Sequence, residues 1–425
     1  MKKDEFLEIL KQKLKNFLNF KKIYYSKKGK ESFFCIELNN FKICFYPLSA
    51  NLILNKNFYT EYKVLNNHPL TIAEEKQKDF IIKLVELLYF KKGGLQWDKS
   101  VPMLDWEKLT SLSDQEFKKV KNIKEVFEVN TKDKEVVRFF LRINQNCNQE
   151  CIFCPIDNSQ KQKVDINYLK IIINKINTVY PAVNKNFIIS GGEPLLHPNY
   201  IELINYIIKN KKSGITIQTN ASLLDKPKFY EPFSKNKHVN YFISFHSHRE
   251  DIYDLLSSTQ NKYSKVVKGI INILTKTKNW VTINCVVNSY NFPYIDDYIN
   301  FLKDKFAAIR PISMYLSSVS LNKQGRDDYL IKFSEAVPKL VEIIENKSNK
   351  NLHFQGFQGI CGFPLCFLQY YPKYFHFNEL EEIEERVKPT VCSRCLYNKN
   401  CPGLIIEYIE KFGVKELKPI ITKIK

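Results

Sequence analysis

The chain has 425 residues, 44% of them hydrophobic, and a formal net charge of +20. This length predicts two or three domains, and the apolar fraction excludes wholesale disorder. The positive charge comes mostly from lysines spread along the whole chain, so it favours a general composition bias over a nucleic-acid-binding surface. Nucleic acid is therefore the less favoured partner.

The sequence carries no recognisable targeting or membrane-spanning segment. Residues 1–13 mix Lys, Asp and Glu and lack the apolar core of a signal peptide. The longest charge-free stretch, residues 351–372, contains three Gly and two Pro, which is not typical of a membrane span. We expect a cytoplasmic protein with no membrane partner. In that reducing compartment the 11 cysteines indicate metal ligands or catalysis rather than a disulfide framework.

Residues 1–130 are expected to form an α+β domain. Apolar spacing predicts helices over 4–20 and 71–89, and a two-residue turn predicts paired strands over 32–38 and 41–46. That turn places Cys35 opposite Cys44, where we expect two reduced thiols on one face of the sheet. The polar stretch 106–134 predicts a helical connector.

Short apolar strands alternate with amphipathic helices in the middle region, residues 131–330. Six strands are expected, over 136–143, 187–190, 215–219, 241–245, 281–287 and 312–316. Helices are expected between them, over 167–179, 200–209, 263–275 and 294–302. Repeated βα units predict an α/β fold, a partial (β/α)6 TIM-like barrel with its chemistry at the carboxyl ends of the strands.

Residues 331–425 are expected to form a small cysteine-rich, cluster-binding domain. Helices are predicted over 330–346 and, in an acidic segment, over 378–386, and the segment 403–412 is expected to be helical or mixed. Five cysteines fall in this region, which indicates a metal site rather than a purely packed core.

Three cysteines, Cys147, Cys151 and Cys154, follow the first barrel strand directly. Three thiolates do not complete a structural zinc site, which takes four ligands. They can bind three irons of a [4Fe–4S] cluster and leave the fourth iron open to another ligand. The alternative is a zinc knuckle completed by His197 or a remote cysteine.

A second motif, residues 190–194 with the sequence SGGEP, ends the next strand. Gly191 and Gly192 would let the backbone approach a ligand closely. Glu193 would accept hydrogen bonds from an ammonium group, and Pro194 would fix the turn. Alone, a turn of this composition is weak evidence of function.

Together and in this order, the CxxxCxxC and GGEP motifs resemble the radical S-adenosylmethionine (SAM) superfamily over residues 136–320. The resemblance implies that Cys147, Cys151 and Cys154 bind a [4Fe–4S] cluster whose open iron holds SAM. It implies reductive cleavage of SAM to methionine and a 5′-deoxyadenosyl radical that abstracts hydrogen from substrate. The implied SAM contacts are Phe153 beside the adenine, Gly191, Gly192, Glu193 and Pro194 around the amino group, and Thr219, Asn220 and Ser244 near methionine or ribose. Short polar residues such as the last three are also common in ordinary turns.

A CxxC pair near the end of the chain, Cys392 and Cys395, is followed by Cys401 and preceded by Cys366. This spacing resembles the SPASM or twitch extension of radical SAM enzymes and implies one auxiliary [4Fe–4S] cluster on these four cysteines. Cys361 could replace Cys366. The competing interpretation is a structural four-cysteine zinc site.

The resemblance favours an enzyme that modifies a peptide or protein, as in the maturation of ribosomally made peptides, using an external electron donor of the flavodoxin or ferredoxin type. Residues 1–130 would recognise a leader peptide or cap the barrel, and a basic chain suits an acidic leader. The alternatives are a small-molecule or nucleotide-modifying enzyme similar to molybdopterin-precursor synthases, RNA modification, and a non-enzymatic Fe–S or zinc interaction protein. No catalytic side chain can be named.

Weaker features accompany these motifs. His246 and His248 follow the fourth strand, where they could bind metal or move protons; a loop leading into a helix explains them equally well. Cys285 is expected in the core. Arg310 and Tyr315 lie near the sixth strand, where they could face substrate.

Overall fold

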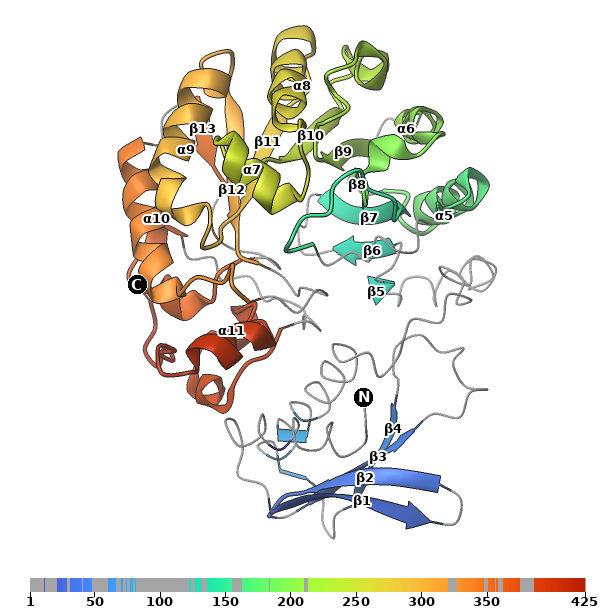
Figure 1. Ribbon diagram of the computed structural model, residues 1–425. Helices are drawn as coiled ribbons and strands as arrows, with labels where there is room; N and C mark the ends of the chain where they lie inside the picture. Colours follow the sequence, from blue (N-terminus) through green and yellow to red (C-terminus); the bar gives the residue numbers. More distant parts are fainter. Residues whose placement is uncertain are drawn as a thin grey trace. The chain divides into compact units, whose positions relative to one another are not determined.

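In the computed structural model the chain divides into two compact units, which are described separately (Figure 1). One unit comprises Lys99–Phe363 and Lys373–Asn378, and the other comprises Met1–Asp98, Pro364–Pro372 and Glu379–Lys425. Besides a few single positions between 11 and 81, the structure describes residues 21–28, 31–39, 41–47, 60–65, 122–123, 127–130, 136–154, 163–182, 184–209, 213–319, 327–347, 351–355, 357, 362–374 and 386–424. No helix in these ranges is both long and apolar enough to cross a bilayer.

The larger unit is built on a nine-stranded sheet in the order β13-β12-β11-β10-β9-β8-β7-β6-β5. Strands β7 to β13 run parallel, and β5 and β6 add an antiparallel edge. The strands are β5 Asn122–Ile123, β6 Phe127–Asn130, β7 Val136–Asn144, β8 Asn184–Gly191, β9 Ser213–Thr219, β10 Val239–Ser244, β11 Val281–Val286, β12 Ile312–Ser317 and β13 Leu352–Phe354. The parallel α/β barrel expected from the sequence is confirmed.

Helices connect these strands and cover the outer side of the curved sheet (Figure 1). The α-helices are α5 Ile166–Val179, α6 Tyr200–Ile208, α7 Glu250–Ser257, α8 Tyr263–Lys276, α9 Ile295–Phe301 and α10 Phe333–Lys347. Short helical turns are η3 Pro194–Leu196, η4 Pro227–Phe229, η5 Glu231–Phe233, η6 Phe292–Tyr294 and the π-helical η7 Leu302–Ala307. Each helix buries an apolar stripe, such as Leu169, Ile172, Ile173, Ile176 and Val179 of α5, which is what holds it on the sheet.

The inner face of the sheet is unusually polar. Tyr241 and Ile243 of β10 are buried, and Phe245 packs against Tyr253 of α7, so these alternate residues point outward. The residues between them point inward, and strand register extends this inner row across β9 to β13: Gln218, Phe242, Ser244, Thr282, Asn284, Val286, Ser313, Tyr315, Ser317 and His353. TIM barrels instead fill this space with Val, Ile and Leu.

Two parts of the sheet differ from the sequence prediction. The seventh parallel strand, β13, was not expected, because three residues are too short to show a strand pattern. The expectation of a helical connector over 106–134 is wrong where the structure describes it, since β5 and β6 lie there. Register explains β6: Phe127 pairs with Leu141 and Val129 with Phe139 of β7, so tertiary pairing overrides the polar composition.

The smaller unit contains a four-stranded antiparallel sheet in the order β1-β2-β3-β4. Its strands are β1 Lys22–Lys28, β2 Glu31–Glu37, β3 Lys42–Pro47 and β4 Thr60–Leu65. The predicted register of β2 on β3 is confirmed, with Cys35 opposite Cys44. The outer strands β1 and β4 were not expected.

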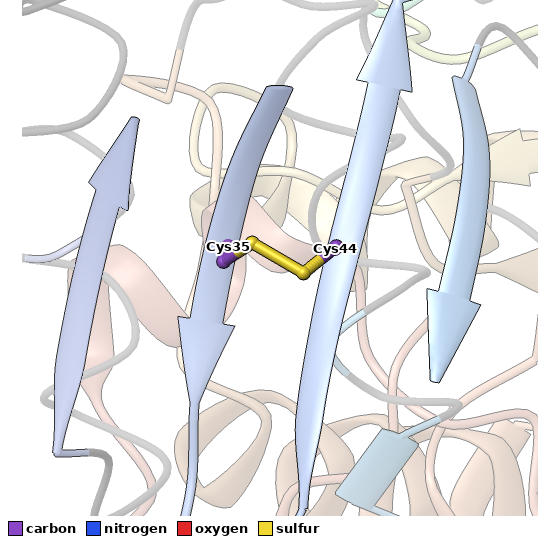
Figure 2. The surroundings of a disulfide bond; sticks show 2 residues. All are labelled: Cys35 and Cys44. Atoms are coloured by element: carbon purple, nitrogen blue, oxygen red, sulfur yellow. A yellow bond between two sulfur atoms is a disulfide. The ribbon is translucent and has the colours of Figure 1, made fainter. Parts of the chain in front are cut away.

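The expectation that Cys35 and Cys44 are reduced is wrong. Figure 2 shows a disulfide joining them across β2 and β3. Their Cα atoms lie 4.2 Å apart, the close spacing of a non-hydrogen-bonded antiparallel pair, and both residues are fully buried. Cysteine count and compartment had favoured free thiols, but register brings the two sulfurs into bonding reach.

The rest of the smaller unit includes η8 Leu365–Phe367, η10 Thr390–Arg394, η11 Asn398–Asn400 and α11 Ile406–Phe412; a further turn, η9, spans Pro372–Tyr374. Helix α11 agrees with the helix expected within 403–412. Of the helix predicted over 4–20, only Lys11 is among the described residues. Of the helix predicted over 378–386, only Arg386 is. At the start of the helix predicted over 71–89, the Thr71 N–H donates to the Glu74 carboxylate at 2.8 Å, as in an N-terminal capping box.

Candidate active site

The cluster loop, residues 147–154, follows β7 and is held by the end of helix α7. The Glu150 and Ile152 N–H groups donate to the Ser257 and Leu256 carbonyls, each at 3.0 Å. Carbonyls in the last turn of a helix lack partners within that helix, so the loop uses groups that α7 leaves open. Ile152 is 3% exposed and anchors the loop in the core.

The thiols of this loop lie in a setting that disfavours free thiolates. Burial, followed by the negative charges of Glu193 and Cys154, raises the pKa of Cys147 to about 12. Burial, then Cys154 and Cys147, raise the pKa of Cys151. A bound metal centre deprotonates its thiols and supplies the missing positive charge, so these residues fit one.

Among the described residues, no three His, Cys, Asp or Glu side chains are grouped as the ligands of one metal ion. Ligands of a four-iron cluster each bind a different iron, so they stand farther apart than ligands that share one ion.

The SGGEP turn packs directly against residues 144–146, which lead from β7 into the cluster loop. The Gly192 N–H donates to the Asn144 carbonyl at 2.7 Å, and the Glu193 N–H donates to the Asn146 carbonyl at 2.8 Å. A Cβ on Gly191, whose φ is +132°, would lie 2.0 Å from the Asn144 carbonyl oxygen, and one on Gly192 would lie 2.3 Å from that of Asn146. The two glycines are therefore required by the approach of two chain segments, where the sequence had indicated the approach of a ligand.

Glu193 is the anchor of this turn. Its carboxylate accepts hydrogen bonds from Thr219 Oγ1 at 2.7 Å, from the Asn220 N–H at 2.8 Å and from the Leu195 N–H at 3.1 Å. The residue is 1% exposed, and burial raises the pKa of its carboxyl to about 7. In the structure this carboxylate joins the turn to the end of β9, and its expected contact with an ammonium group stays a prediction.

The structure shows the neighbours of three other expected SAM contacts. Thr219 points to Glu193, as above. The Asn220 side chain reaches the cluster loop, donating to Cys147 Sγ at 3.8 Å and to Asn148 Oδ1 at 2.8 Å. Ser244 is half-buried at the inward-facing end of β10. Of these three, Ser244 keeps the inward-facing position that a ligand contact requires.

Comparison with known proteins bears directly on this site. Residues 141–302 match the radical SAM superfamily. This stretch is a radical SAM superfamily domain. The superfamily implies an enzyme with a [4Fe–4S] cluster and SAM.

Individual relatives are distant. An uncharacterized protein of Methanocaldococcus jannaschii is 28% identical over 169 residues, which are 38% of this chain and 57% of that protein, so the chain spans little more than half of that relative. A probable GTP 3′,8-cyclase of Methanothermobacter thermautotrophicus is 25% identical over 213 residues, 49% of this chain and 68% of that protein. The crystal structure of Streptococcus suis SuiB bound to S-adenosylmethionine aligns with a TM-score of 0.45 at 18% identity, covering 81% of this chain and 73% of that one.

Asn144 was not singled out from the sequence, and His246 was named there only as a weaker feature. Asn144 is fully buried, and its Nδ2 donates to the Glu193 carbonyl at 2.7 Å. The His246 ring packs edge-on against Phe153, with ring centroids 5.0 Å apart. Its Nδ1 accepts the Val286 N–H at 3.1 Å, and burial lowers its pKa to about 4. His246 is therefore neutral at physiological pH, with its proton on Nε2.

Other candidates have structural partners. His197 uses both ring nitrogens, Nε2 with the Val164 carbonyl at 2.9 Å and Nδ1 with the Asn199 N–H at 3.2 Å, so it does not complete a zinc knuckle. Arg310 donates to the Thr277, Ile273 and Asn279 carbonyls near the end of α8. Cys285 is fully buried in the core, as expected.

In the smaller unit, four cysteines line one cavity. Cys366, Cys392, Cys395 and Cys401 surround it together with apolar residues that include Leu365, Val387, Leu404 and Leu417. Burial raises the pKa of Cys366, and the nearby Cys401 and Cys392 raise it further, which indicates that the sulfurs converge. The Gly403 N–H donates to Cys401 Sγ at 3.5 Å. Cys361 lies outside the described residues.

Proposed function

We propose that the loop of Cys147, Cys151 and Cys154 binds a [4Fe–4S] cluster, and that the backbone of the turn at Gly191, Gly192, Glu193 and Pro194 binds the amino group of SAM. The observation that supports this is the direct hydrogen bonding of the glycine turn to Asn144 and Asn146, the residues that lead into the cysteine loop at the carboxyl ends of parallel strands. When bound, the cluster and SAM supply reductive cleavage of SAM and a radical that abstracts hydrogen.

The chain's own residues would do the positioning. Helix α7 fixes the loop, and Glu193 and Asn144 fix the turn. Phe153 and the neutral His246 form one wall, with the His246 Nε2–H as a donor. Ser244 is the remaining polar group for methionine or ribose. Buried, fully bonded side chains hold such a site without reorganisation.

Cleavage of SAM by the anaerobically reconstituted, reduced protein tests this proposal. We expect wild type to release methionine and 5′-deoxyadenosine, and Cys151→Ala to fall to background. Cys285→Ala is the matched control, because it removes a buried barrel thiol outside the loop and should keep the wild-type rate. Wild type that holds iron yet cleaves no SAM would favour the non-enzymatic interpretation.

We further propose that Cys366, Cys392, Cys395 and Cys401 bind one auxiliary [4Fe–4S] cluster. Four protein ligands leave it no open iron, which favours a role in electron transfer to or from a substrate radical. Reduction of the SAM-binding cluster would use an external donor of the flavodoxin or ferredoxin type. Residues 1–130 remain the candidate for leader-peptide recognition.

The substrate that we favour is a peptide or protein. The described inner face of β9 to β13 offers amides and hydroxyls such as Asn284, Ser317 and Ser313, and Ser317 Oγ already donates to Asn284 Oδ1 at 3.1 Å. Uncharged donors and acceptors of this kind match the peptide bond. At the described inward positions of these strands there is no Lys or Arg.

A nucleotide substrate is the second candidate, favoured by the likeness to probable GTP 3′,8-cyclases. A triphosphate is bound by charge-assisted hydrogen bonds. The described inward positions of β9 to β13 supply no such donor, so a triphosphate would depend on Arg138 and Arg142, which occupy inward positions of β7. We therefore expect equilibrium dialysis of the SAM-loaded protein to show GTP binding weaker than about 1 mM. Micromolar binding that Ser317→Ala or Asn284→Ala weakens would instead place a nucleotide in the barrel.

A further inference from the structure

Three side chains beside the cluster loop form a closed ring of hydrogen bonds. Asn148 Nδ2 donates to Ser222 Oγ at 2.8 Å, and Ser222 Oγ donates to Asn220 Oδ1 at 2.7 Å. Asn220 Nδ2 closes the ring by donating to Asn148 Oδ1 at 2.8 Å. The ring joins the loop that carries Cys147 to the turn that follows β9.

The orientation of the Asn220 amide follows from a backbone group. Its Oδ1 also accepts the Ser222 N–H at 3.0 Å, and an N–H can only donate. The Nδ2 end must therefore face the cluster loop. One of its hydrogens goes to Asn148, and the other points to Cys147 Sγ at 3.8 Å.

The backbone around Asn220 is held firmly. Its own N–H donates to Glu193, and the next residue, Ala221, is fully buried in the left-handed region with φ of 60°. Helix α8 packs tightly here, since a Cβ on Gly269 would lie 2.5 Å from the Ala221 carbonyl oxygen. A strained residue that its surroundings hold in place is typical of functional sites.

We propose that Asn220 is a positioning residue for the Cys147 thiolate, and that its N–H raises the reduction potential of the cluster on this loop. The inference rests on the proposed function, which places that cluster there. A hydrogen bond to a ligating sulfur stabilises the more negative, reduced state of a cluster. This role for Asn220 differs from the SAM contact that the sequence resemblance implies.

The test is the midpoint potential of the SAM-binding cluster, followed by electron paramagnetic resonance of the reconstituted full-length chain at a series of applied potentials. Asn220→Ala should lower the potential by an amount equal to a tenfold change in the reduced-to-oxidised ratio, about 59 mV for one electron. Asn220→Asp should lower it further, because it replaces the donor with a negative charge. Asn279→Ala is the control: Asn279 is fully buried and donates to the Phe233, Asn236 and Val239 carbonyls, away from the loop.

The outcomes separate this inference from the proposed function. A wild-type cluster whose spectrum changes when SAM is added, together with unchanged potentials in both Asn220 variants, would overturn the inference alone. A wild-type chain that holds no reducible cluster on Cys147, Cys151 and Cys154 would overturn both. If Asn279→Ala lowers the midpoint potential by the same amount, the effect of the Asn220 variants comes from general loosening of the barrel, and the inference is overturned.

Discussion

Replacement of Cys147, Cys151 and Cys154 together by Ala is expected to halve the iron content, from about eight to about four irons per chain. Each of the two sets of cysteines would hold one four-iron cluster, and each set lies in a different compact unit. Loss of one set should therefore leave the other filled. Iron, acid-labile sulfide and zinc, counted per chain after anaerobic reconstitution, give the measurement.

Replacement of Cys366, Cys392, Cys395 and Cys401 by Ala should give the reciprocal result, with about four irons retained on the cluster loop. Cys285→Ala should keep the full complement, because Cys285 lies in the core outside both groups. Wild type with about four irons and one zinc, the zinc lost only in the second variant, would make the site in the smaller unit structural and remove the auxiliary cluster from the proposal.

Gly192→Ala is expected to destabilise the barrel by about 3 kcal/mol or more and to abolish SAM binding. The new Cβ would lie 2.3 Å from the Asn146 carbonyl oxygen and 2.6 Å from that of Gln145. Both are backbone atoms, so the clash is relieved only if the turn moves away from the cluster loop. Denaturant unfolding gives the stability, and isothermal calorimetry with SAM gives the binding.

Gly214→Ala is the matched control for this prediction, since Gly214 lies in β9 of the same sheet. Its added Cβ would meet Asn186 Oδ1 at 3.4 Å, an ordinary contact, and stability should change by about 0.5 kcal/mol or less. If Gly192→Ala unfolds like wild type and binds SAM with unchanged affinity, the close packing of the two motifs has no role in the site.

Much of the barrel could be predicted because its strands are apolar runs separated by helices of clear amphipathic spacing. All six expected strands are present, and the motif cysteines and glycines fall at strand ends as the βα pattern requires. The short β13 has too few residues to show a period, and β6 owes its pairing to β7, which lies outside its own sequence.

Side-chain partners were harder to predict than positions. The sequence shows that Gly191 and Gly192 permit a close approach, but it does not show which chain segment approaches them. Likewise, nothing in the sequence distinguishes Asn144 from the other asparagines; its role follows from the fold, which brings it into hydrogen-bonding contact with Glu193. The turn between β2 and β3 predicted that Cys35 faces Cys44, whereas spacing alone carries no information about their oxidation state.

The two hydrogen bonds from α7 to the cluster loop have a consequence for assembly. Many small metal sites are unfolded until metal arrives, and their binding energy is spent on ordering the ligands. Here the Glu150 and Ile152 amides are already satisfied by carbonyls of a protein helix. The backbone shape of the loop therefore depends on helix α7 as well as on the metal ligands.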